Sequence, residues 1–342
     1  MIVKQEGLDE KMSDQQQGFI NSGQETNAFS VAHIGILVAD VIAKPVDTIP
    51  ERGKLGLVEG LSLANGGCAM TAAVNMATIG LKTALIGKIG RDGFGSYLTG
   101  VLQDAGVNID GLVVQNGAAT SASVALIDSG GERTFLHCQG ANAEFCEQDI
   151  AYDIIKKSGI VFVAGTMLMP AFDGAQCKTF LEKAKALGKT TALDTAWDSK
   201  GRWMELLAPC LPYVDYFMPS YEEAVCLAGD LTDPEAIATL FFEKGVTTAV
   251  VIKMGKDGCF IKESLHSAGY SLPAYTHIVP VDTTGAGDSF CSGFLSGLSL
   301  GRPLVDCGKL GNAAGAHCVM ATGATRGMRP LDVLDAFIAQ NE

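Results

Sequence analysis

The chain has 342 residues, of which 47% are hydrophobic and 18% are charged. This length allows one large α/β domain or two smaller domains, with a sizeable core in either case. The 25 basic and 38 acidic residues give a net charge of −13, which argues against nucleic acid or an anionic membrane as the main partner, since both require basic patches. A polyanionic small molecule would need a local site of backbone N–H groups and a metal.

The ten cysteines are scattered without a Cys-x-x-Cys pair, and no secretory leader is evident. We therefore expect free thiols in a reducing cytoplasm and no disulfide framework. The five histidines show no metal-ligand spacing, which argues against a zinc site. Polar residues and glycines interrupt the longest uncharged stretch, residues 60–81, so we expect no membrane span.

The first part of the chain predicts a tail and two kinds of β structure. Residues 1–27 are polar and aperiodic, and we expect a disordered tail before a folded domain over residues 28–342. Residues 30–39 indicate a buried strand with Asp40 at its end. Strand patterns also occur within two further segments, and we expect these to form a small second sheet. The two segments are residues 41–65 and 112–138.

From residue 147 onward the pattern alternates between amphipathic helices and continuous apolar strands. This alternation predicts a doubly wound α/β fold, in which helices cover both faces of a mostly parallel sheet. The strands expected in this part are 160–164, 190–194, 216–219 and 248–253, and the helices are 147–157, 174–187, 220–228, 234–244, 304–321 and 331–340. Before residue 147, a strand is expected at 83–89 and helices at 68–79 and 94–105.

A glycine-rich turn, residues 285–287, lies between a strand pattern at 276–281 and an apolar helical segment at 290–298. Unpaired N–H groups at the positive end of a helix bind phosphate without a lysine. Asp288 follows within the first helical turn. A carboxylate beside an anion is costly unless it accepts a proton from an attacking hydroxyl; the alternative interpretation is a simple capping or dipole contact. The chain has no P-loop motif and no convincing dinucleotide-binding motif.

Three strings together resemble the ribokinase-like (PfkB) carbohydrate kinases. They are GGCAMTA at 66–72, IGRDGFG at 89–95 and DTTGAGDSF at 282–290. The resemblance extends from about residue 30 to residue 340. It implies a doubly wound α/β domain with a small β-sheet lid, and an ATP-dependent sugar kinase that transfers a phosphoryl group from MgATP to an alcohol.

The resemblance also implies roles for individual residues. Asp288 corresponds to the catalytic base, and the backbone N–H groups of Gly285, Ala286 and Gly287 correspond to an anion hole for the transferred phosphoryl group. Lid strands in this family often pair between subunits, which implies a homodimer.

Asp40, Gly66, Gly67 and Thr71 correspond to sugar-binding positions. The alternative interpretations are a cap for Asp40 and an ordinary turn for the two glycines. Thr71 stands where many members carry an asparagine, and Val38 replaces an asparagine of ribose-specific members. Because a buried site with unmatched polar partners discriminates strongly, both departures put ribose in doubt.

The resemblance further implies ligands for the nucleotide and for metal ions. The positions that correspond to nucleotide contacts are Ser220, Lys253, Gly255, Asp257, Gly258, Thr284 and Asn312. Glu223 corresponds to the residue that contacts Mg²⁺ through water. The positions that correspond to a monovalent-cation site for K⁺ are Asp282, Thr284, Cys318, Ala321 and Gly323. Ser220 is shorter than the usual asparagine, and Asn312 has the alternative interpretation of a polar residue on an apolar helix.

Two other functions remain open at this stage. A nucleoside kinase of the same fold would need aromatic stacking surfaces in the lid, where the proposed segments offer only Phe135. A non-catalytic binder of nucleotide or sugar would have no need of Asp288 beside an intact glycine turn. Arg133, on a predicted lid strand, is interpreted as solvated, with a substrate charge as its alternative partner.

Overall fold

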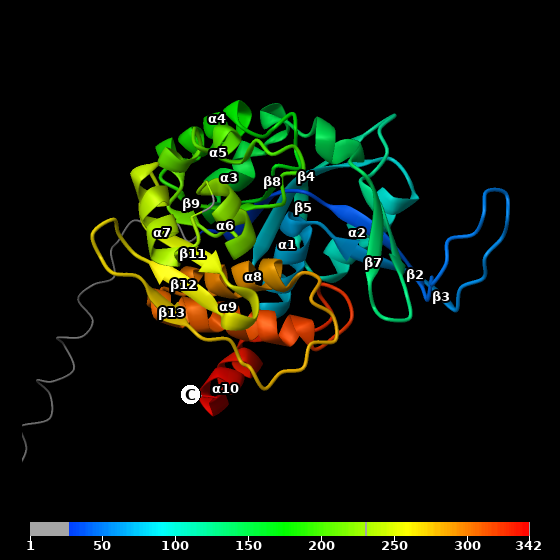
Figure 1. Cartoon of the computed structure of the whole chain (residues 1–342). Coiled ribbons are helices and arrows are strands. Elements are labelled where there is room, and N and C mark those ends of the chain that lie inside the picture. Colours follow the sequence, from blue (N-terminus) through cyan, green and yellow to red (C-terminus); the bar gives the residue numbers. More distant parts are fainter. Residues whose placement is uncertain (1–26, 230, 342) are drawn as a thin grey trace, which may run out of the picture.

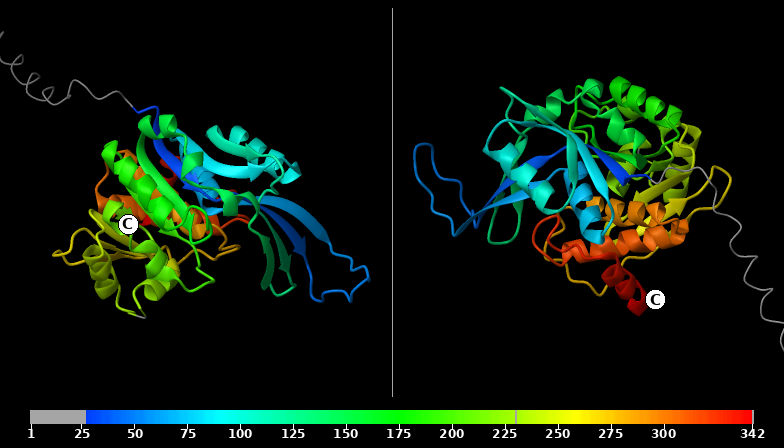
Figure 2. Two further views of the ribbon diagram at one scale, coloured as in Figure 1. Left: turned by 90° about the horizontal axis from the view of Figure 1, so that it is seen from above. Right: turned by 180° about the vertical axis from the view of Figure 1, so that it is seen from behind.

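The computed structural model describes residues 27–229 and 231–341, so the predicted tail lies outside the described residues except for Asn27. The described chain forms a large sheet with helices on both faces, and a small sheet that projects from one end of it (Figures 1 and 2). This arrangement confirms the predicted doubly wound α/β class with a second, smaller sheet.

The large sheet has nine strands. They are β1 (Phe29–Gly35), β4 (Thr83–Gly90), β5 (Asn108–Gln115), β8 (Ser158–Thr166), β9 (Thr190–Thr195), β10 (Tyr216–Phe217), β11 (Ala249–Lys253), β12 (Cys259–Lys262) and β13 (Tyr270–Leu272). Their spatial order is β13-β12-β11-β10-β9-β8-β1-β4-β5. Every pair from β11 to β5 is parallel, whereas β12 and β13 pair antiparallel. The carboxyl ends of the parallel strands therefore meet at one edge, where ligands bind in such sheets.

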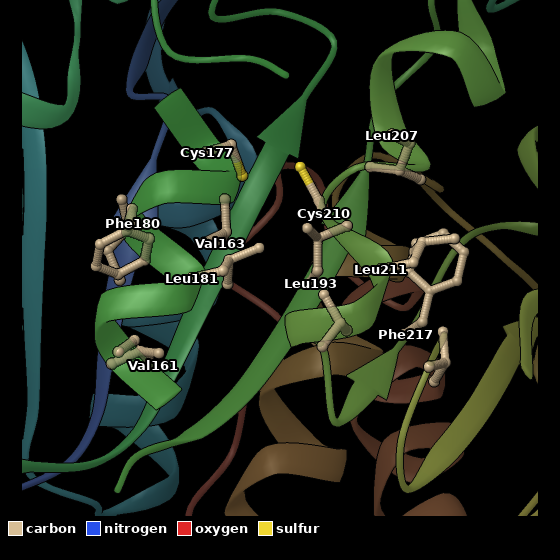
Figure 3. Close-up of a cluster of buried hydrophobic side chains, with 14 of the residues drawn as sticks. Val161, Val163, Cys177, Phe180, Leu181, Leu193, Leu207, Cys210, Leu211 and Phe217 are labelled. Atoms are coloured by element: carbon tan, nitrogen blue, oxygen red, sulfur yellow. The ribbon is translucent and has the colours of Figure 1, made fainter. Parts of the chain in front are cut away.

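The helices are α1 (Cys68–Ile79), α2 (Gly93–Asp104), α3 (Tyr152–Lys156), α4 (Ala175–Ala186), α5 (Trp203–Leu207), α6 (Tyr221–Leu227), α7 (Pro234–Glu243), α8 (Ala286–Ser299), α9 (Leu304–Val319) and α10 (Leu331–Asn341). They form two layers on the sheet, except α10, which packs on α9. One core joins α4, α6 and α7 to the sheet, and a second joins α1, α2 and α8 to its other face. Figure 3 shows part of the first core, where Phe180 and Leu181 of α4 pack beside Val161 and Val163 of β8.

The small sheet consists of β2 (Val38–Lys44), β3 (Gly60–Gly66), β6 (Ala122–Ile127) and β7 (Arg133–Cys138), in the order β3-β2-β6-β7. The single strand predicted over residues 30–39 is wrong, because β1 ends at Gly35 and β2 belongs to the other sheet. A Cβ on Gly35 would stand 1.9 Å from the Ala164 carbonyl oxygen, so the tight packing here depends on glycine. Asp40 consequently lies inside β2 instead of at the end of a large-sheet strand.

Other elements also differ from the sequence prediction, because contacts between distant segments decide them. Residues 108–115 form an edge strand of the large sheet, so only the later part of the segment 112–138 belongs to the small sheet. No strand forms at 276–281, where Val281 donates its N–H to the Val319 carbonyl (2.7 Å) at the end of a helix. Helix α8 begins at Ala286, ahead of the apolar segment 290–298, and carries Asp288 in its first turn as the sequence predicted. The predicted helix over 147–157 is a 3₁₀ turn followed by the short α3.

His33 lies in the middle of β1, fully buried, with its ring edge-on to Phe162 at 5.8 Å between centroids. Neither ring nitrogen has a hydrogen-bond partner among the described residues. Burial lowers the pKa of His33 to about 3 from the ordinary value of 6.5, so the folded protein holds the ring neutral.

Acid should therefore destabilise the fold through His33. Below pH 6.5 the unfolded chain binds a proton that the folded chain excludes, so stability falls as pH drops from 6.5 toward 3, by about 1.4 kcal/mol per pH unit. We expect His33→Leu to reduce this loss, as measured by urea unfolding at pH 7 and pH 5. His266→Gln, at an exposed histidine, should leave the pH dependence unchanged; equal pH dependence in all three proteins would contradict the assignment.

Candidate active site

The glycine-rich turn at the start of α8 has the geometry of an anion site. Gly285 has a φ of 76° and caps the helix without a side-chain hydrogen bond, and its Cβ, if present, would stand 2.4 Å from the Cβ of Ala324. Glycine is therefore required there both for conformation and for space. Among the described residues, the N–H groups of Gly287 and Asp288 have no acceptor, while that of Ala286 reaches the Thr283 carbonyl at 3.3 Å. These free donors point out of the positive end of a helix.

Asp288, in the first turn of α8, is partly buried. Burial raises the pKa of its carboxyl to about 7; the nearby Asp194 adds to this effect, and Lys253 opposes it. The thiol of Cys68 lies within hydrogen-bonding reach of the carboxylate. A carboxylate with a pKa near 7 is well matched to general base catalysis at neutral pH.

A buried ion pair lies beneath this turn. Lys253, at the end of β11, places its Nζ 2.5 Å from Oδ2 of Asp194 on β9, and both side chains are at least 90% buried. Nζ also lies 3.6 Å from the point where a Cβ on Gly287 would stand. Burial opposes the charge of Lys253, but Asp194, Cys291 and other nearby acids outweigh it and raise the pKa of this lysine. The ammonium is therefore a fixed positive charge directly below the anion site.

The sequence prediction assigned Lys253 to the nucleotide and did not single out Asp194. The structure directs the Lys253 side chain inward to Asp194. The sequence did contain a signal for this pair. Asp194 and Lys253 are each the last residue of a predicted apolar strand, and the carboxyl ends of parallel strands meet at one edge of the sheet.

Glu223 lies at the same edge, in the first turn of α6. Its Oε2 accepts hydrogen bonds from the Thr195 hydroxyl (2.9 Å) and from the N–H of Ser220 (3.1 Å). Ser220 caps α6 and accepts in return from the Glu223 N–H. The Ser220 hydroxyl is thus engaged in a capping box, whereas Oε1 of Glu223 has no partner among the described residues.

The predicted sugar residues gather where β2, β3 and α1 meet. A Cβ on Gly66 would stand 2.3 Å from Oδ2 of Asp40, and one on Gly67 would stand 2.6 Å from the Ile36 carbonyl oxygen. Thr71 has a buried hydroxyl without a partner among the described residues. Cys68 directly follows Gly67 and meets Asp288, so this cluster adjoins the candidate base.

The small sheet adds a polar row that the sequence analysis missed. Asp40 on β2 is directly opposite Ser123 on β6, and Ser123 is directly opposite His137 on β7, so the three share one face. Ser123 donates to Asp40, and its hydroxyl lies 3.0 Å from Nδ1 of His137. Burial raises the pKa of Asp40 to about 6. Only strand register reveals this row, because the three residues are far apart in sequence.

The predicted nucleotide loop forms a short turn, Gly255–Asp257, between β11 and β12. Gly258 has a φ of 92°, and a Cβ there would stand 2.0 Å from the Leu272 carbonyl oxygen. Asn312 on α9 donates its side-chain amide to the carbonyls of Leu272 and Pro273, both at 3.1 Å. This side chain therefore ties α9 to the segment after β13, which supports its structural interpretation.

The predicted cation-binding residues also come together. Oδ2 of Asp282 accepts the Gly323 N–H at 2.9 Å, and the Cys318 thiol contacts the Thr284 carbonyl. Arg133 was interpreted as solvated, and this is wrong. Its guanidinium reaches from β7 to Asp282, at 2.6 Å from Oδ1, and to the Thr284 hydroxyl. Ala321 lies in the same loop and donates its N–H to the carbonyl of Cys318.

Comparison with known proteins gives the class of this chain. Residues 28–330 match the family model described as pfkB family carbohydrate kinase, so the chain belongs to the pfkB family of carbohydrate kinases. It is a phosphotransferase with an alcohol group as acceptor, in a family of ATP-utilising kinases.

Two relatives and one solved structure illustrate the range of similarity. Probable fructokinase-5 of Arabidopsis thaliana is 29% identical over 82% of this chain and 90% of the relative. The 2-dehydro-3-deoxygluconokinase of Bacillus subtilis is 26% identical over 84% of this chain and 91% of the relative. The structure of Arabidopsis thaliana ribokinase complexed with ribose and ATP matches with a TM-score of 0.81 at 22% identity, over 91% of this chain and 99% of the other. That likeness establishes the ribokinase-like fold.

Within residues 27–229 and 231–341, no helix combines the length and apolarity needed to cross a membrane. All ten cysteines fall in this part of the chain and are free thiols.

Proposed function

We propose that this protein transfers the γ-phosphate of ATP to a hydroxyl of a small carbohydrate, with Asp288 as the general base. One observation supports this most directly. Asp288 lies at the start of α8, where two backbone N–H groups are unpaired. Its carboxylate also contacts the thiol of Cys68, which directly follows the Gly66–Gly67 turn beside Asp40. A phosphoryl group and a hydroxyl acceptor could thus meet at the same acid.

In the proposed mechanism, the sugar binds between the small sheet and the start of α1. Asp40 accepts hydrogen bonds from sugar hydroxyls, and the free hydroxyl of Thr71 offers another partner. The Asp288 carboxylate then removes the proton from the acceptor oxygen as that oxygen attacks phosphorus. Such assistance is typically worth about 10²–10⁴ in rate.

The proposed anion hole is the turn of residues 285–287 at the start of α8, with the Lys253 ammonium below it. Its free donors include the N–H groups of Gly287 and of the adjoining Asp288, whereas the Ala286 N–H reaches the Thr283 carbonyl. Unpaired N–H groups stabilise charge on the transferring phosphoryl oxygens, and removal of one such donor typically costs about 10²–10³ in rate. The nucleotide would extend from there toward Gly255, Asp257, Gly258 and Asn312. Because Asn312 is already hydrogen-bonded, its contribution is to shape this side of the site.

The described residues contain no cluster of three or more His, Cys, Asp or Glu side chains that could hold a metal. This fits Mg²⁺, which is usually held by phosphates and waters with one or two carboxylates. Glu223 suits that role, since its Oε1 is free to accept a hydrogen bond from a metal-bound water. When bound, Mg²⁺ neutralises charge on the β- and γ-phosphates.

The substrate is tested with an ADP-release assay on a panel of pentoses, hexoses and nucleosides. ADP release that depends on one sugar supports the proposal and identifies the acceptor. Release with nucleosides alone would instead support a nucleoside kinase. ATP binding without release for any acceptor would indicate a non-catalytic binder.

We further propose that the protein is a cytoplasmic homodimer formed through the small sheet. Free thiols are consistent with a reducing compartment. Leu63, Val41, Val124 and Leu136 are directly opposite one another in register on the face away from Asp40. Leu136 is 64% exposed and Val124 is 37% exposed, so the end of this apolar row on β6 and β7 is available to a second copy.

Leu136→Glu is expected to halve the mass measured by light scattering, because a charge in an apolar interface would remain unpaired. Leu187→Glu, at an exposed leucine next to α4, should leave the mass unchanged. An unaltered mass for Leu136→Glu, or a monomeric wild-type protein, would rule out this interface.

A further inference from the structure

Arg133 joins the small sheet to the loop that precedes the anion hole. It begins β7, directly after the turn between β6 and β7, and is separated by about 150 residues from its two partners. Its Nη2 lies 2.6 Å from Oδ1 of Asp282, and its Nη1 donates to the hydroxyl of Thr284. The Arg133 side chain is 29% exposed and that of Asp282 is 12% exposed, so this is a largely enclosed contact.

Asp282 connects three segments of the chain. Oδ1 accepts the Thr284 N–H at 2.9 Å in addition to Arg133, and Oδ2 accepts the Gly323 N–H at 2.9 Å. Both oxygens of the carboxylate are therefore engaged by donors, one of them the charged guanidinium of Arg133.

These contacts do not fit a separately bound monovalent cation. Asp282 and Thr284 are residues that the family resemblance assigns to that cation, and both accept hydrogen bonds from the Arg133 guanidinium, Asp282 through its carboxylate and Thr284 through its hydroxyl. A second positive charge at the same oxygens would be repelled by Arg133. A planar guanidinium with several donors is well suited to such a pair of acceptors.

We propose that Arg133 takes the place of the monovalent cation, holds Thr284 and the adjoining Gly285 turn in position, and makes this positioning depend on the small sheet. Thr284 immediately precedes Gly285, so any displacement of the loop moves the anion-hole donors. Arg133 is a positioning residue that acts through this loop. The effect on catalysis rests on the proposed kinase function, whereas the effect on the loop does not.

The first test compares activity in potassium chloride and in tetramethylammonium chloride at equal ionic strength. The wild-type protein should show equal rates in both salts. Arg133→Ala should lose about tenfold or more in kcat in tetramethylammonium, since it removes two hydrogen bonds from a charged donor, and K⁺ should restore part of that loss. Arg52→Ala, at an exposed arginine between β2 and β3, serves as the control and should behave as wild type.

The second test needs no substrate. Amide hydrogen exchange over residues 282–288 should be faster in Arg133→Ala than in wild type and Arg52→Ala, and K⁺ should raise the Tm of Arg133→Ala alone. Arg133→Lys keeps the charge and loses the planar guanidinium, so its exchange rate over residues 282–288 should lie between those of wild type and Arg133→Ala. Strong K⁺ activation of the wild-type enzyme, or unchanged exchange over residues 282–288 in Arg133→Ala, would overturn the proposal. If the wild-type protein phosphorylates no sugar, the hydrogen-exchange and Tm measurements still test whether Arg133 positions the loop.

Discussion

Asp288→Asn is expected to lower kcat by about 10²–10⁴-fold while the protein still folds and binds ATP. The amide has nearly the same shape as the carboxylate but cannot accept the proton of the attacking hydroxyl. The measurement is ADP release with the identified acceptor, alongside nucleotide affinity by calorimetry. Asp332→Asn is the matched control, because Asp332 is also an acid in the first turn of a helix, α10, but is exposed. Near-normal turnover of Asp288→Asn would refute the assigned base.

The pH profile gives an independent check of the same role. Because burial and the nearby Asp194 raise the pKa of Asp288 to about 7, the base is protonated and inactive in acid. The rate at limiting substrate should therefore rise between pH 6 and pH 8 and then level off. Asp288→Asn should lose this inflection along with its activity, whereas Asp332→Asn should retain it.

Asp194→Asn is expected to cost about 3–5 kcal/mol of unfolding free energy, because it leaves the buried Lys253 ammonium without a counter-charge. The two side chains meet at 2.5 Å and are 2% and 10% exposed, so water cannot replace the lost carboxylate. Urea unfolding at pH 7.5 measures the loss. Activity should fall as well, since the Lys253 ammonium loses the partner that fixes its position beneath the proposed anion hole.

A second substitution separates charge from shape. Lys253→Met in the Asp194→Asn background should recover part of the lost stability, because it removes the uncompensated charge. Glu182→Gln is the control, since it breaks an exposed pair with Lys178 at 3.8 Å and should cost less than about 1 kcal/mol. An Asp194→Asn protein no less stable than Glu182→Gln would show that the pair contributes little.

Local patterns predicted the elements whose boundaries are set by nearby residues. The helix over residues 68–79 has the observed bounds, because Gly67 lies before its first residue and Gly80 ends it with a φ of 113°. The strands that alternate with helices after residue 147 are continuous apolar runs, as burial on both faces requires. The antiparallel strands β12 and β13 were missed, since they are short and owe their existence to pairing with β11.

Part of the candidate site could be predicted from local sequence, and part of it could not. Its glycine turn and Asp288 are adjacent in sequence, so their shared helix start could be predicted. The Asp194–Lys253 pair spans 59 residues, and the contacts of Arg133 span 149 and 151 residues. Neither contact leaves a local pattern, because the charges meet only when strand ends or separate sheets are brought together.

The sequence by itself determined the α/β class, most helices and the position of the glycine turn before α8, because periodicity, glycine and capping chemistry act over a few residues. Only the tertiary structure decided that Asp40 belongs to a second sheet, that Lys253 faces inward and that Arg133 reaches the loop before Gly285. Strand register and sheet order set these contacts, and both depend on packing between distant parts of the chain.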